Sequence, residues 1–578
     1  MKKRFNEDHM DQSQLFKITS EDYADLIINK NESSHLIDIF PNMTINEVTS
    51  DISILHFPVA YMNDSSISLL GYHTIPSCYG LLTADHVKGF QQNFTSNSLQ
   101  TDLQGKGVII GFIDTGIDYQ HSAFLKDDKT TRILSIWDQS IDSSNHPSGF
   151  LYGTEYKSEE INDALKNEDP LSIVPSTDLI GHGTMIAGVA AGSPAPEFEF
   201  SGTAPKADLL IVKLKEAKTY LKDFYVIPRL ANAYQETDIL LGIKYLEQEA
   251  ERLNRPLVIV IALGTNDSDH IGRSFLGRYI NELAYKTGRA LVAAAGNEGN
   301  RGLHYYGNIT IMNRTEEVYM EIARDDPGFT LQFWGAPPNY FWVDIYSPEG
   351  DLLSRLPPIH QNTVTIHYKD ATIITDTLLD DPYSTEQFLI LRFFNPPSGS
   401  WKFHVTTYSE DIPGEFHMWL PLHNFSVVET KFINPNTYTT ITDPANNEKL
   451  ITITAYDPAD NSLYYNASRG FTLTNQPKPN IAAPGVNVIC PYLNNQFIMS
   501  TATSLAAAYT AGIIADIFEW GIVEGNIPNL NNIILQHTLL LTAERTNDMT
   551  YPNKDFGYGT LNTNKLLDVL EQYRIDVK

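Results

Sequence analysis

The stretch VIIGFIDTG, residues 108–116, decides the fold class. Its first six residues form an unbroken apolar run, which is typical of a strand buried on both faces of a sheet. Amphipathic helix patterns cover 239–246 and 275–283. Similar apolar runs occur before, between and after these patterns, at 209–214, 257–263 and 290–295. Buried strands alternating with amphipathic helices predict a parallel α/β sheet flanked by helices.

Residues 305–430 differ in character from the sequence on either side. They hold β-rich segments separated by Pro, Gly, Asp and Asn turns, with no convincing helix between them. This pattern predicts an all-β sandwich inserted into the α/β domain. The α/β pattern then resumes, with a strand at 450–455 and helices over 504–518 and 566–573.

Composition excludes several classes of protein. Hydrophobic residues make up 42% of the 578 residues, which supplies a sizeable core and rules out global disorder. The net charge of −29 is the wrong sign for a protein that binds phosphates, so nucleic acid is not an expected partner. Two cysteines cannot build a disulfide framework or a Cys-rich metal site. No run approaches the roughly 20 apolar residues of a membrane span. The basic N-terminus lacks the apolar stretch of a secretory signal, so a spore or cytoplasmic location is expected.

Three short motifs supply groups suited to acyl transfer. Asp114 follows the buried strand, His182 opens a helix within GHGT, residues 181–184, and Ser504 begins another helix. A serine nucleophile needs an imidazole to take its proton and a buried carboxylate to hold the imidazole. A side-chain amide is available at Asn297, and such an oxyanion donor is worth roughly 10²–10³ in rate.

Each motif alone has a plainer interpretation. An aspartate after a strand is usually a cap or a turn former, and a lone histidine at a helix start is usually structural. A serine at a helix start is usually an N-cap. Asp-Thr-Gly also begins aspartic-protease sites, but the second such motif that those sites need is absent from the sequence.

The conjunction of the motifs, in this order and in these contexts, resembles the subtilisin-like serine proteases. The stretch KPNIAAPG, residues 478–485, lies before Ser504 as the corresponding family motif does. The resemblance implies that Ser504 is the nucleophile, His182 the general base, Asp114 the orienting carboxylate and Asn297 the oxyanion donor. It also implies that the walls of the pocket for the residue before the scissile bond are formed by Leu263, Gly264, Ala293, Ala294, Ala295 and Gly296.

The family match covers roughly residues 100–304 and 430–570, and a narrower resemblance is to the Csp germination proteases of clostridial spores. It rests on the position of the β-rich insert and on the stretch EWGIV, residues 519–523. It implies an α+β prodomain at 1–85, a catalytic domain in two parts at 86–304 and 431–578, and a jelly-roll at 305–430. The expected partners are a protein or peptide substrate, the zymogen of a spore cortex-lytic hydrolase, and the protein's own prodomain bound in the cleft.

Self-cleavage is expected between about Tyr79 and Asp85, at the end of the prodomain. No cofactor or metal is expected, because the segment after the His182 helix, residues 192–200, lacks the calcium-liganding pattern of the family. Ala502 replaces the family's glycine two residues before the serine, and this substitution is strained only if the backbone φ there is positive.

Two rival interpretations stay open at this point. The first is a catalytically silent relative that binds a partner or senses a small molecule, with Ala502 as the direct argument for it. The presence of all three candidate catalytic residues favours an active endopeptidase instead. The second is carbohydrate binding by the insert, which rests only on Trp334, Trp342 and Trp401. Such aromatic residues are more often part of the core of a sandwich.

Overall fold

The computed structural model describes residues 12–30, 44–63, 67, 70–82, 85–87, 102–359, 362–379 and 386–574. Its largest sheet has the strand order β26-β25-β13-β11-β6-β9-β7-β8, and only the β7–β8 pair is antiparallel. The strands are β6 (Ile109–Asp114), β7 (Ile133–Asp138), β8 (Thr154–Lys157), β9 (Asp208–Lys213), β11 (Leu257–Ile261), β13 (Arg289–Ala294), β25 (Ile451–Tyr456) and β26 (Ile481–Pro484). The parallel sheet predicted from the apolar runs is confirmed.

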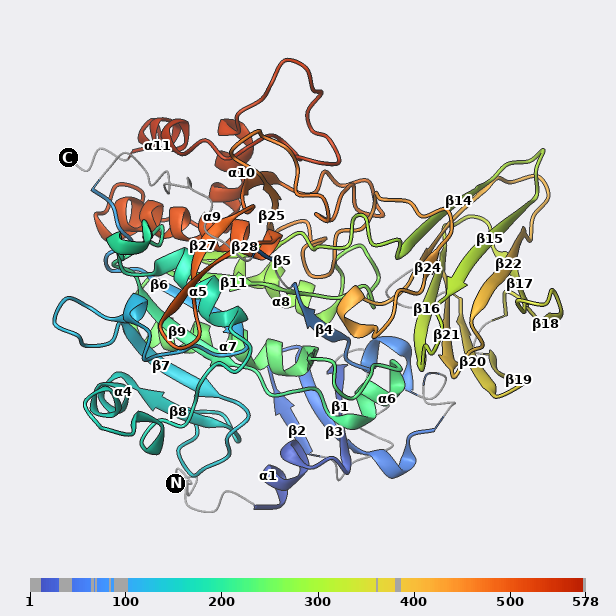
Figure 1. Cartoon of the computed structure of the whole chain (residues 1–578), viewed down its shortest axis with the longest axis horizontal. Helices are drawn as coiled ribbons and strands as arrows, with labels where there is room; N and C mark the ends of the chain where they lie inside the picture. The colour runs from blue at the N-terminus through green and yellow to red at the C-terminus, as the bar shows by residue number, and fades with distance from the viewer. Residues whose placement is uncertain are drawn as a thin grey trace, which may run out of the picture.

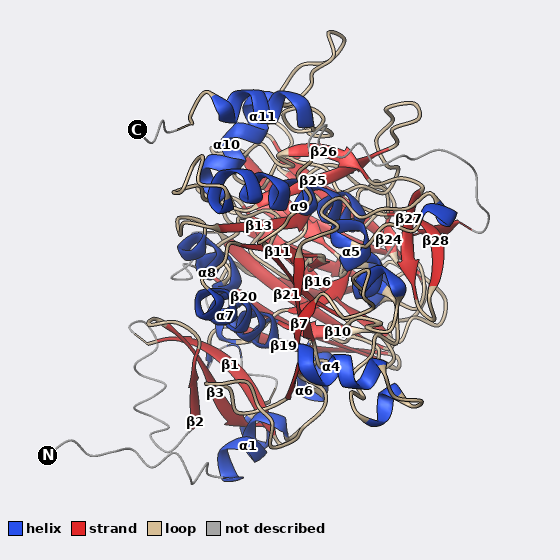
Figure 2. Cartoon of the chain, turned by 90° about the vertical axis from the view of Figure 1, so that its left-hand side faces the viewer, coloured by secondary structure: helices blue, strands red, loops and turns tan. Residues whose placement is uncertain are grey.

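Helices cover both faces of this sheet (Figure 2). On one face lie α5 (His182–Ala191) and α9 (Thr503–Phe518), and on the other lie α7 (Glu236–Leu253) and α8 (Phe275–Leu283). Helices α5 and α9 consist mostly of small residues, so they approach each other and the sheet closely. Further helices of this part of the chain are α4 (Ser158–Leu165), α6 (Thr219–Phe224), α10 (Asn532–Thr542) and α11 (Thr563–Glu571).

One helical stretch in the described part of the chain, Thr503–Val523, is long and apolar enough to cross a membrane. Its most apolar window is 83% buried inside the protein, however. The stretch is therefore the central core helix of the fold, and its apolar character is explained by its packing against the sheet.

The inserted segment forms two antiparallel sheets packed face to face, on the right of Figure 1. The first sheet contains β14 (His304–Ile309), β23 (Gly414–Trp419), β16 (Gly328–Gly335), β21 (Gln387–Phe394), β20 (Ala371–Leu378) and β19 (Asn362–Tyr368). The second contains β18 (Leu352–Leu356), β17 (Phe341–Tyr346), β22 (Gly399–Thr407), β15 (Thr315–Ile322) and β24 (Lys431–Phe432). Trp334 and Trp401 are buried, whereas Trp342 is half-buried against Arg355. The all-β insert predicted from the turn-separated strands is confirmed.

The N-terminal part of the chain forms a small separate sheet, drawn in blue at the bottom of Figure 1. Its order is β1-β3-β2, and β1 packs against α7. The elements are α1 (Gln12–Thr19), β1 (Tyr23–Asn29), β2 (Thr44–Glu47) and β3 (Ile52–Pro58). The linker predicted over 91–104 lies outside the described residues as far as residue 101.

After this sheet the chain approaches the large sheet. Strand β4 (Cys78–Leu81) lies between β10 (Ala233–Gln235) and β12 (Leu263–Gly264), antiparallel to both. Strand β5 (Asp85–Val87) pairs with β28 (Gln496–Thr501), whose other neighbour is β27 (Val488–Tyr492). Strand β12 follows the carboxyl end of β11, so β4 lies at the carboxyl edge of the large sheet, which is the usual place for a site in such folds.

Candidate active site

The predicted carboxylate and imidazole lie in contact at the carboxyl edge of the sheet. Asp114 is the last residue of β6, and His182 is the first residue of α5. Both carboxylate oxygens of Asp114 lie 2.9 Å from His182 Nδ1, and both side chains are buried. Hydrogen bonding at Nδ1 fixes the ring so that Nε2 faces the cleft as the atom that can accept a proton.

Local sequence explains why α5 begins at this place. Asp178 accepts hydrogen bonds from the backbone N–H groups of Gly181 and Thr184, so it satisfies donors at the start of the helix. Gly183 is required by close packing, because a Cβ there would lie 2.2 Å from the carbonyl oxygen of Gly116. The glycine beside His182 thus lets the helix approach the loop that follows Asp114.

Two opposing effects act on the protonation of His182. Burial lowers the pKa of His182, while the charge of Asp114 and its hydrogen bonds raise it. The second effect is larger, so the pKa of His182 lies above its ordinary value of 6.5. A raised pKa makes His182 a stronger base for the proton of a nucleophile.

The predicted nucleophile lies in the first turn of α9, where the helix N-terminus favours negative charge. The hydroxyl group of Ser504 is fully buried and donates to the carbonyl oxygen of Leu82 at 3.1 Å, rather than to His182. The residue before α9, Ala502, has φ −168° and ψ 160°. This is extended backbone that any residue adopts, so alanine at this position carries no strain from a positive φ.

Asn297 lies beside the start of the same helix. Its side-chain oxygen accepts hydrogen bonds from the backbone N–H of Thr503 at 3.2 Å and from the Thr503 hydroxyl at 2.9 Å. An amide held by its oxygen presents its nitrogen as the donor group. The structure therefore brings together Asp114 with His182, and Asn297 with the first turn of α9.

The carbonyl oxygen of Leu82 connects the two halves of this site. It lies 3.4 Å from His182 Nε2 as well as 3.1 Å from Ser504 Oγ. The N–H of Leu82 donates to the carbonyl oxygen of Ala262 at 3.2 Å, which extends the ladder between β4 and β12 by one residue. The carbonyl group of Leu82 thus lies where the reacting carbonyl group of a substrate would lie. The sequence motifs did not predict which residue occupies the cleft.

The predicted pocket walls divide between the two faces of the sheet. Leu263 and Gly264 form β12 and pair with Leu81 and Gly80. Leu82 packs in the same apolar cluster as Ala294. The side chains of Ala293 and Ala295 belong to the cluster on the opposite face.

Close packing identifies the floor of the pocket, which the sequence did not place. A Cβ at Gly264 would lie 3.1 Å from Leu82 Cδ2 and 2.5 Å from the hydroxyl oxygen of Thr442. A Cβ at Gly296 would lie 2.6 Å from the hydroxyl oxygen of Ser468. Thr442 and Ser468 follow the inserted sandwich in the chain, and no local sequence signal distinguishes them from other polar residues.

The segment that lacks the calcium pattern, residues 192–200, lies beside a buried arginine. The Arg132 guanidinium donates to the carbonyl oxygens of Ala123 and Ala207, next to this segment. Glu197 and Glu199 of the segment are exposed. In the described part of the chain, no group of three or more His, Cys, Asp or Glu side chains is arranged to hold a metal ion.

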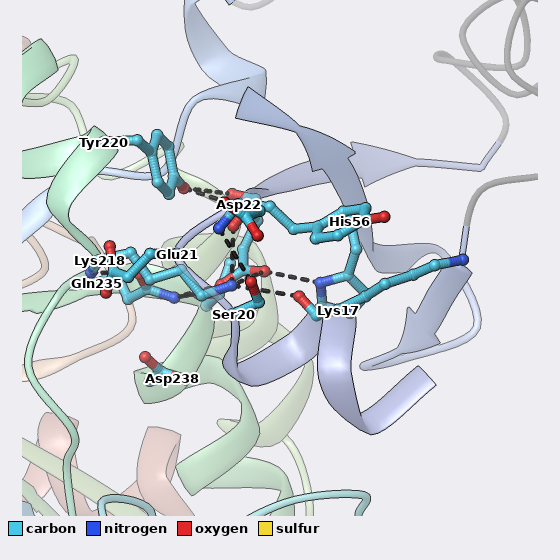
Figure 3. A network of polar contacts seen from close by, with 12 residues as sticks. Lys17, Ser20, Glu21, Asp22, His56, Lys218, Tyr220, Gln235 and Asp238 are labelled. Carbon is cyan, nitrogen blue, oxygen red and sulfur yellow. Dashed lines mark hydrogen bonds and ion pairs between the residues drawn. The ribbon is translucent and has the colours of Figure 1, made fainter. Parts of the chain in front are cut away.

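Besides the contact of β4 in the cleft, the N-terminal segment makes a second contact with the rest of the chain. It is a buried network of charges between the β1–β3–β2 sheet and α6 (Figure 3). The carboxylate of Asp25 in β1 accepts from Lys218 Nζ at 2.9 Å and from Gln235 Nε2 at 2.8 Å, and it contacts His56 Nδ1 at 2.7 Å. Burial alone raises the pKa of Asp25, but the Lys218 charge and the His56 hydrogen bond outweigh it, so the pKa lies well below its usual range. Asp25 is therefore held as an ion inside the interface.

Comparison with known proteins shows where this arrangement recurs. Residues 105–321 and 424–559 match the Subtilase family, and the gap between these two stretches lies within the inserted sandwich. The solved structure of the Clostridium perfringens CspB protease is 30% identical with a TM-score of 0.74, and the match covers 83% of this chain and 97% of that one.

Two curated proteins match shorter stretches. Mycosin-3 of Mycobacterium tuberculosis is 33% identical over 127 residues, which are 22% of this chain and 27% of Mycosin-3. Thermitase of Thermoactinomyces vulgaris is 25% identical over 217 residues, which are 37% of this chain and 57% of thermitase. The chain thus spans less than two thirds of the length of these two curated relatives.

Proposed function

We propose that this chain, which belongs to the subtilase family of serine endopeptidases, cleaves peptide bonds through Ser504, His182 and Asp114. The observation that carries the proposal is the shared contact of Ser504 Oγ and His182 Nε2 with the carbonyl oxygen of Leu82. A nucleophile and a base that face the same peptide group from two sides are arranged for attack on that group.

In the proposed reaction the Ser504 oxygen forms a bond to the carbonyl carbon, and its proton passes to His182 Nε2. Asp114 holds the ring in the required tautomer and stabilises the imidazolium that forms. The amide nitrogen of Asn297 and the backbone N–H of Ser504 stabilise the negative oxygen of the tetrahedral intermediate. The carbon–nitrogen bond then breaks, the leaving amine takes the proton from His182, and a water molecule hydrolyses the acyl-enzyme.

The first substrate in this proposal is the chain itself, at the bond between Leu82 and Thr83. Strand β4 holds the residues before this bond in an antiparallel ladder, and β5 pairs with β28 on the far side of it. The cut falls inside the window of Tyr79 to Asp85 expected from the sequence. Residues 1–82 act in this scheme as the prodomain, which the sequence predicted over 1–85, and their end occupies the cleft.

A later substrate in this proposal is the zymogen of a spore cortex-lytic hydrolase. The support is the likeness to the CspB protease, which is 30% identical and extends over 83% of this chain and 97% of that protein. In this chain the sandwich contacts the catalytic part of the fold through Asn266 and supplies Asn424 beside the cleft.

Mass spectrometry of the purified wild type and of Ser504→Ala tests the proposal. Two fragments that meet between Leu82 and Thr83 are expected for the wild type, and one intact chain for the variant. A fluorophosphonate probe should label Ser504 covalently, and His182→Ala should abolish the labelling. Equal intact masses for both proteins, without labelling of folded wild type, would instead support a silent binding protein.

A further inference from the structure

The fourth residue before the proposed cut, Tyr79, lies in a closed pocket. Its side chain is fully buried, and its hydroxyl group donates to Asp443 Oδ2 at 2.5 Å. The ring packs in the apolar cluster that contains Leu263 and Leu276, so the hydroxyl is the polar end of a ring surrounded by apolar side chains. A pocket with one placed polar group at its end is the usual form of a specificity site.

The acceptor at the end of this pocket is held firmly in position. The backbone of Asp443 exchanges two hydrogen bonds of 3.0 Å with the backbone of Thr265, directly after β12. The hydroxyl of Ser274 donates to the same carboxylate oxygen at 3.1 Å. Asp443 is fully buried, and burial raises its pKa to about 8, with the charge of Asp269 acting in the same direction. A carboxyl group with little charge at neutral pH is compatible with an apolar pocket.

We propose that Asp443 is a specificity-determining residue that selects tyrosine at the fourth position before the bond that is cut. The selection applies to the chain's own cut after Leu82 and to peptide substrates that take the place of β4. This inference rests on the proposed function, because it names the kind of sequence which that site accepts.

The chemistry of the pocket separates tyrosine from phenylalanine. With phenylalanine, the buried Asp443 Oδ2 loses one of its two donors and keeps only the Ser274 hydroxyl, and a site built to bond a hydroxyl rejects an analogue that lacks one. The neighbouring third position is less strict. A Cβ at Gly80 would lie 2.9 Å from both Asn424 Oδ1 and Leu422 Cδ1, but these are ends of flexible side chains that can shift.

A double-mutant cycle in the full chain tests the assignment of Asp443. We expect Tyr79→Phe to slow cleavage after Leu82 by about 10- to 100-fold, measured by mass spectrometry over time. Asp443→Leu should slow it by a similar factor, because it removes the carboxyl acceptor and leaves only the Ser274 hydroxyl beside the tyrosine hydroxyl. The double variant should recover most of the wild-type rate, because an apolar ring then meets an apolar side chain.

Tyr152→Phe is the matched control. Tyr152 is also a buried tyrosine whose hydroxyl donates to a buried carboxylate, Asp238 Oδ1 at 2.8 Å, but it lies between β7 and β8, outside the β10–β4–β12 sheet. We expect its rate of cleavage to stay within about twofold of wild type, because the lost hydrogen bond does not involve the segment that is cut. This comparison stands even where Asp443→Leu does not fold, and circular dichroism reports folding for each variant.

The possible outcomes separate the two proposals. If the wild type cleaves itself while Tyr79→Phe keeps its rate, the assignment of Asp443 is wrong and the proposed function stands. A slow Tyr79→Phe whose defect is unchanged in the folded Asp443→Leu background also overturns the assignment. If folded wild type neither cleaves itself nor reacts with the fluorophosphonate probe, both proposals fall.

Discussion

The N-terminal segment contacts the rest of the chain at two places that differ in chemistry. Strand β4 is held in the cleft by backbone ladders and by the buried side chains of Tyr79 and Leu82. The β1–β3–β2 sheet is held at α6 by the network of Asp25, Lys218 and Gln235. A backbone ladder forms with any extended peptide, whereas a buried ion pair fits only its own partner. We infer that the contact of β4 in the cleft is the one at which peptide bonds are cut. The contact of the β1–β3–β2 sheet at α6 keeps the N-terminal segment bound to the rest of the protein.

The largest expected effect is on catalysis in the cleft, with the contact at α6 left intact. Asp114→Asn should lower the rate of cleavage after Leu82 by about 10⁴-fold, because the amide favours the wrong tautomer of His182. The N-terminal sheet should stay attached, since Asp114 lies outside the network at α6. Cleavage is followed by mass spectrometry and attachment by gel filtration.

A suitable control is Asp163→Asn, whose side chain is 72% exposed in α4 and lies outside both contacts. We expect wild-type cleavage and wild-type attachment for this variant. Dissociation of the N-terminal fragment from the slowly formed cut fraction of Asp114→Asn, at a concentration where cut wild type retains it, would contradict the separation of the two contacts.

The converse change should weaken the contact between the N-terminal sheet and α6 and leave cleavage in the cleft unchanged. Asp25→Asn leaves Lys218 buried without its carboxylate, and breaking a buried pair in this way costs about 3–5 kcal/mol. After cleavage, the fragment that ends at Leu82 should dissociate at least about 10²-fold more readily than in wild type. Gel filtration of the cleaved protein at decreasing concentration measures this. Equal retention in Asp25→Asn and Asp163→Asn would show that the network does not hold the sheet.

Mild acid should separate the two contacts without any mutation. Cleavage needs neutral His182, whose pKa is raised, so the rate should fall about tenfold per pH unit below a midpoint above 6.5. The pairing of Asp25 needs its carboxylate, whose pKa is lowered by Lys218 and His56. Its stabilising effect is present above pH 3.8 and is lost only as the pH falls through that lowered pKa.

At pH 5 we therefore expect a chain that is cut slowly while its N-terminal sheet stays attached. Rates measured from pH 5 to 8 by mass spectrometry, with gel filtration at each pH, check both halves. Simultaneous loss of cleavage and attachment would show that one titration controls both contacts.

The smallest expected effect concerns the altered motif at the start of α9. Ala502→Gly should change the rate of cleavage by less than about threefold, because φ −168° suits both residues and the change creates no left-handed backbone. Attachment at α6 should not change. A rate increase of tenfold or more, measured by mass spectrometry, would show that the alanine impairs the cleft after all.

Local pattern was sufficient for the parallel sheet, for α5, α7, α8 and α9, and for the all-β nature of the insert. In each case the signal, apolar residues at a regular spacing or in a run, or strands separated by turn residues, lies within the local sequence of that segment. The same patterns missed short or polar strands such as β18 and β24, which lack an alternating run.

Long-range complementarity explains what sequence reasoning did not find. Thr442, Asp443 and Ser468 reach the cleft only because the sandwich returns the chain to the sheet next to Gly296. Asp25 and Lys218 are 193 residues apart and carry no motif. The motif residues were recognisable because chemistry restricts their type, whereas pocket residues are restricted only by shape and by what they face.

The side chain of Asn424, which reaches from the inserted sandwich to the carbonyl oxygen of Leu81, limits what this enzyme can digest. Strand β4 has β10 along one edge and β12 along the other, and the Asn424 side chain also bonds to its backbone, so a polypeptide must bind there as a single extended chain. Compactly folded domains should resist the protease, and cuts should concentrate in flexible linkers between domains and in segments that unfold locally.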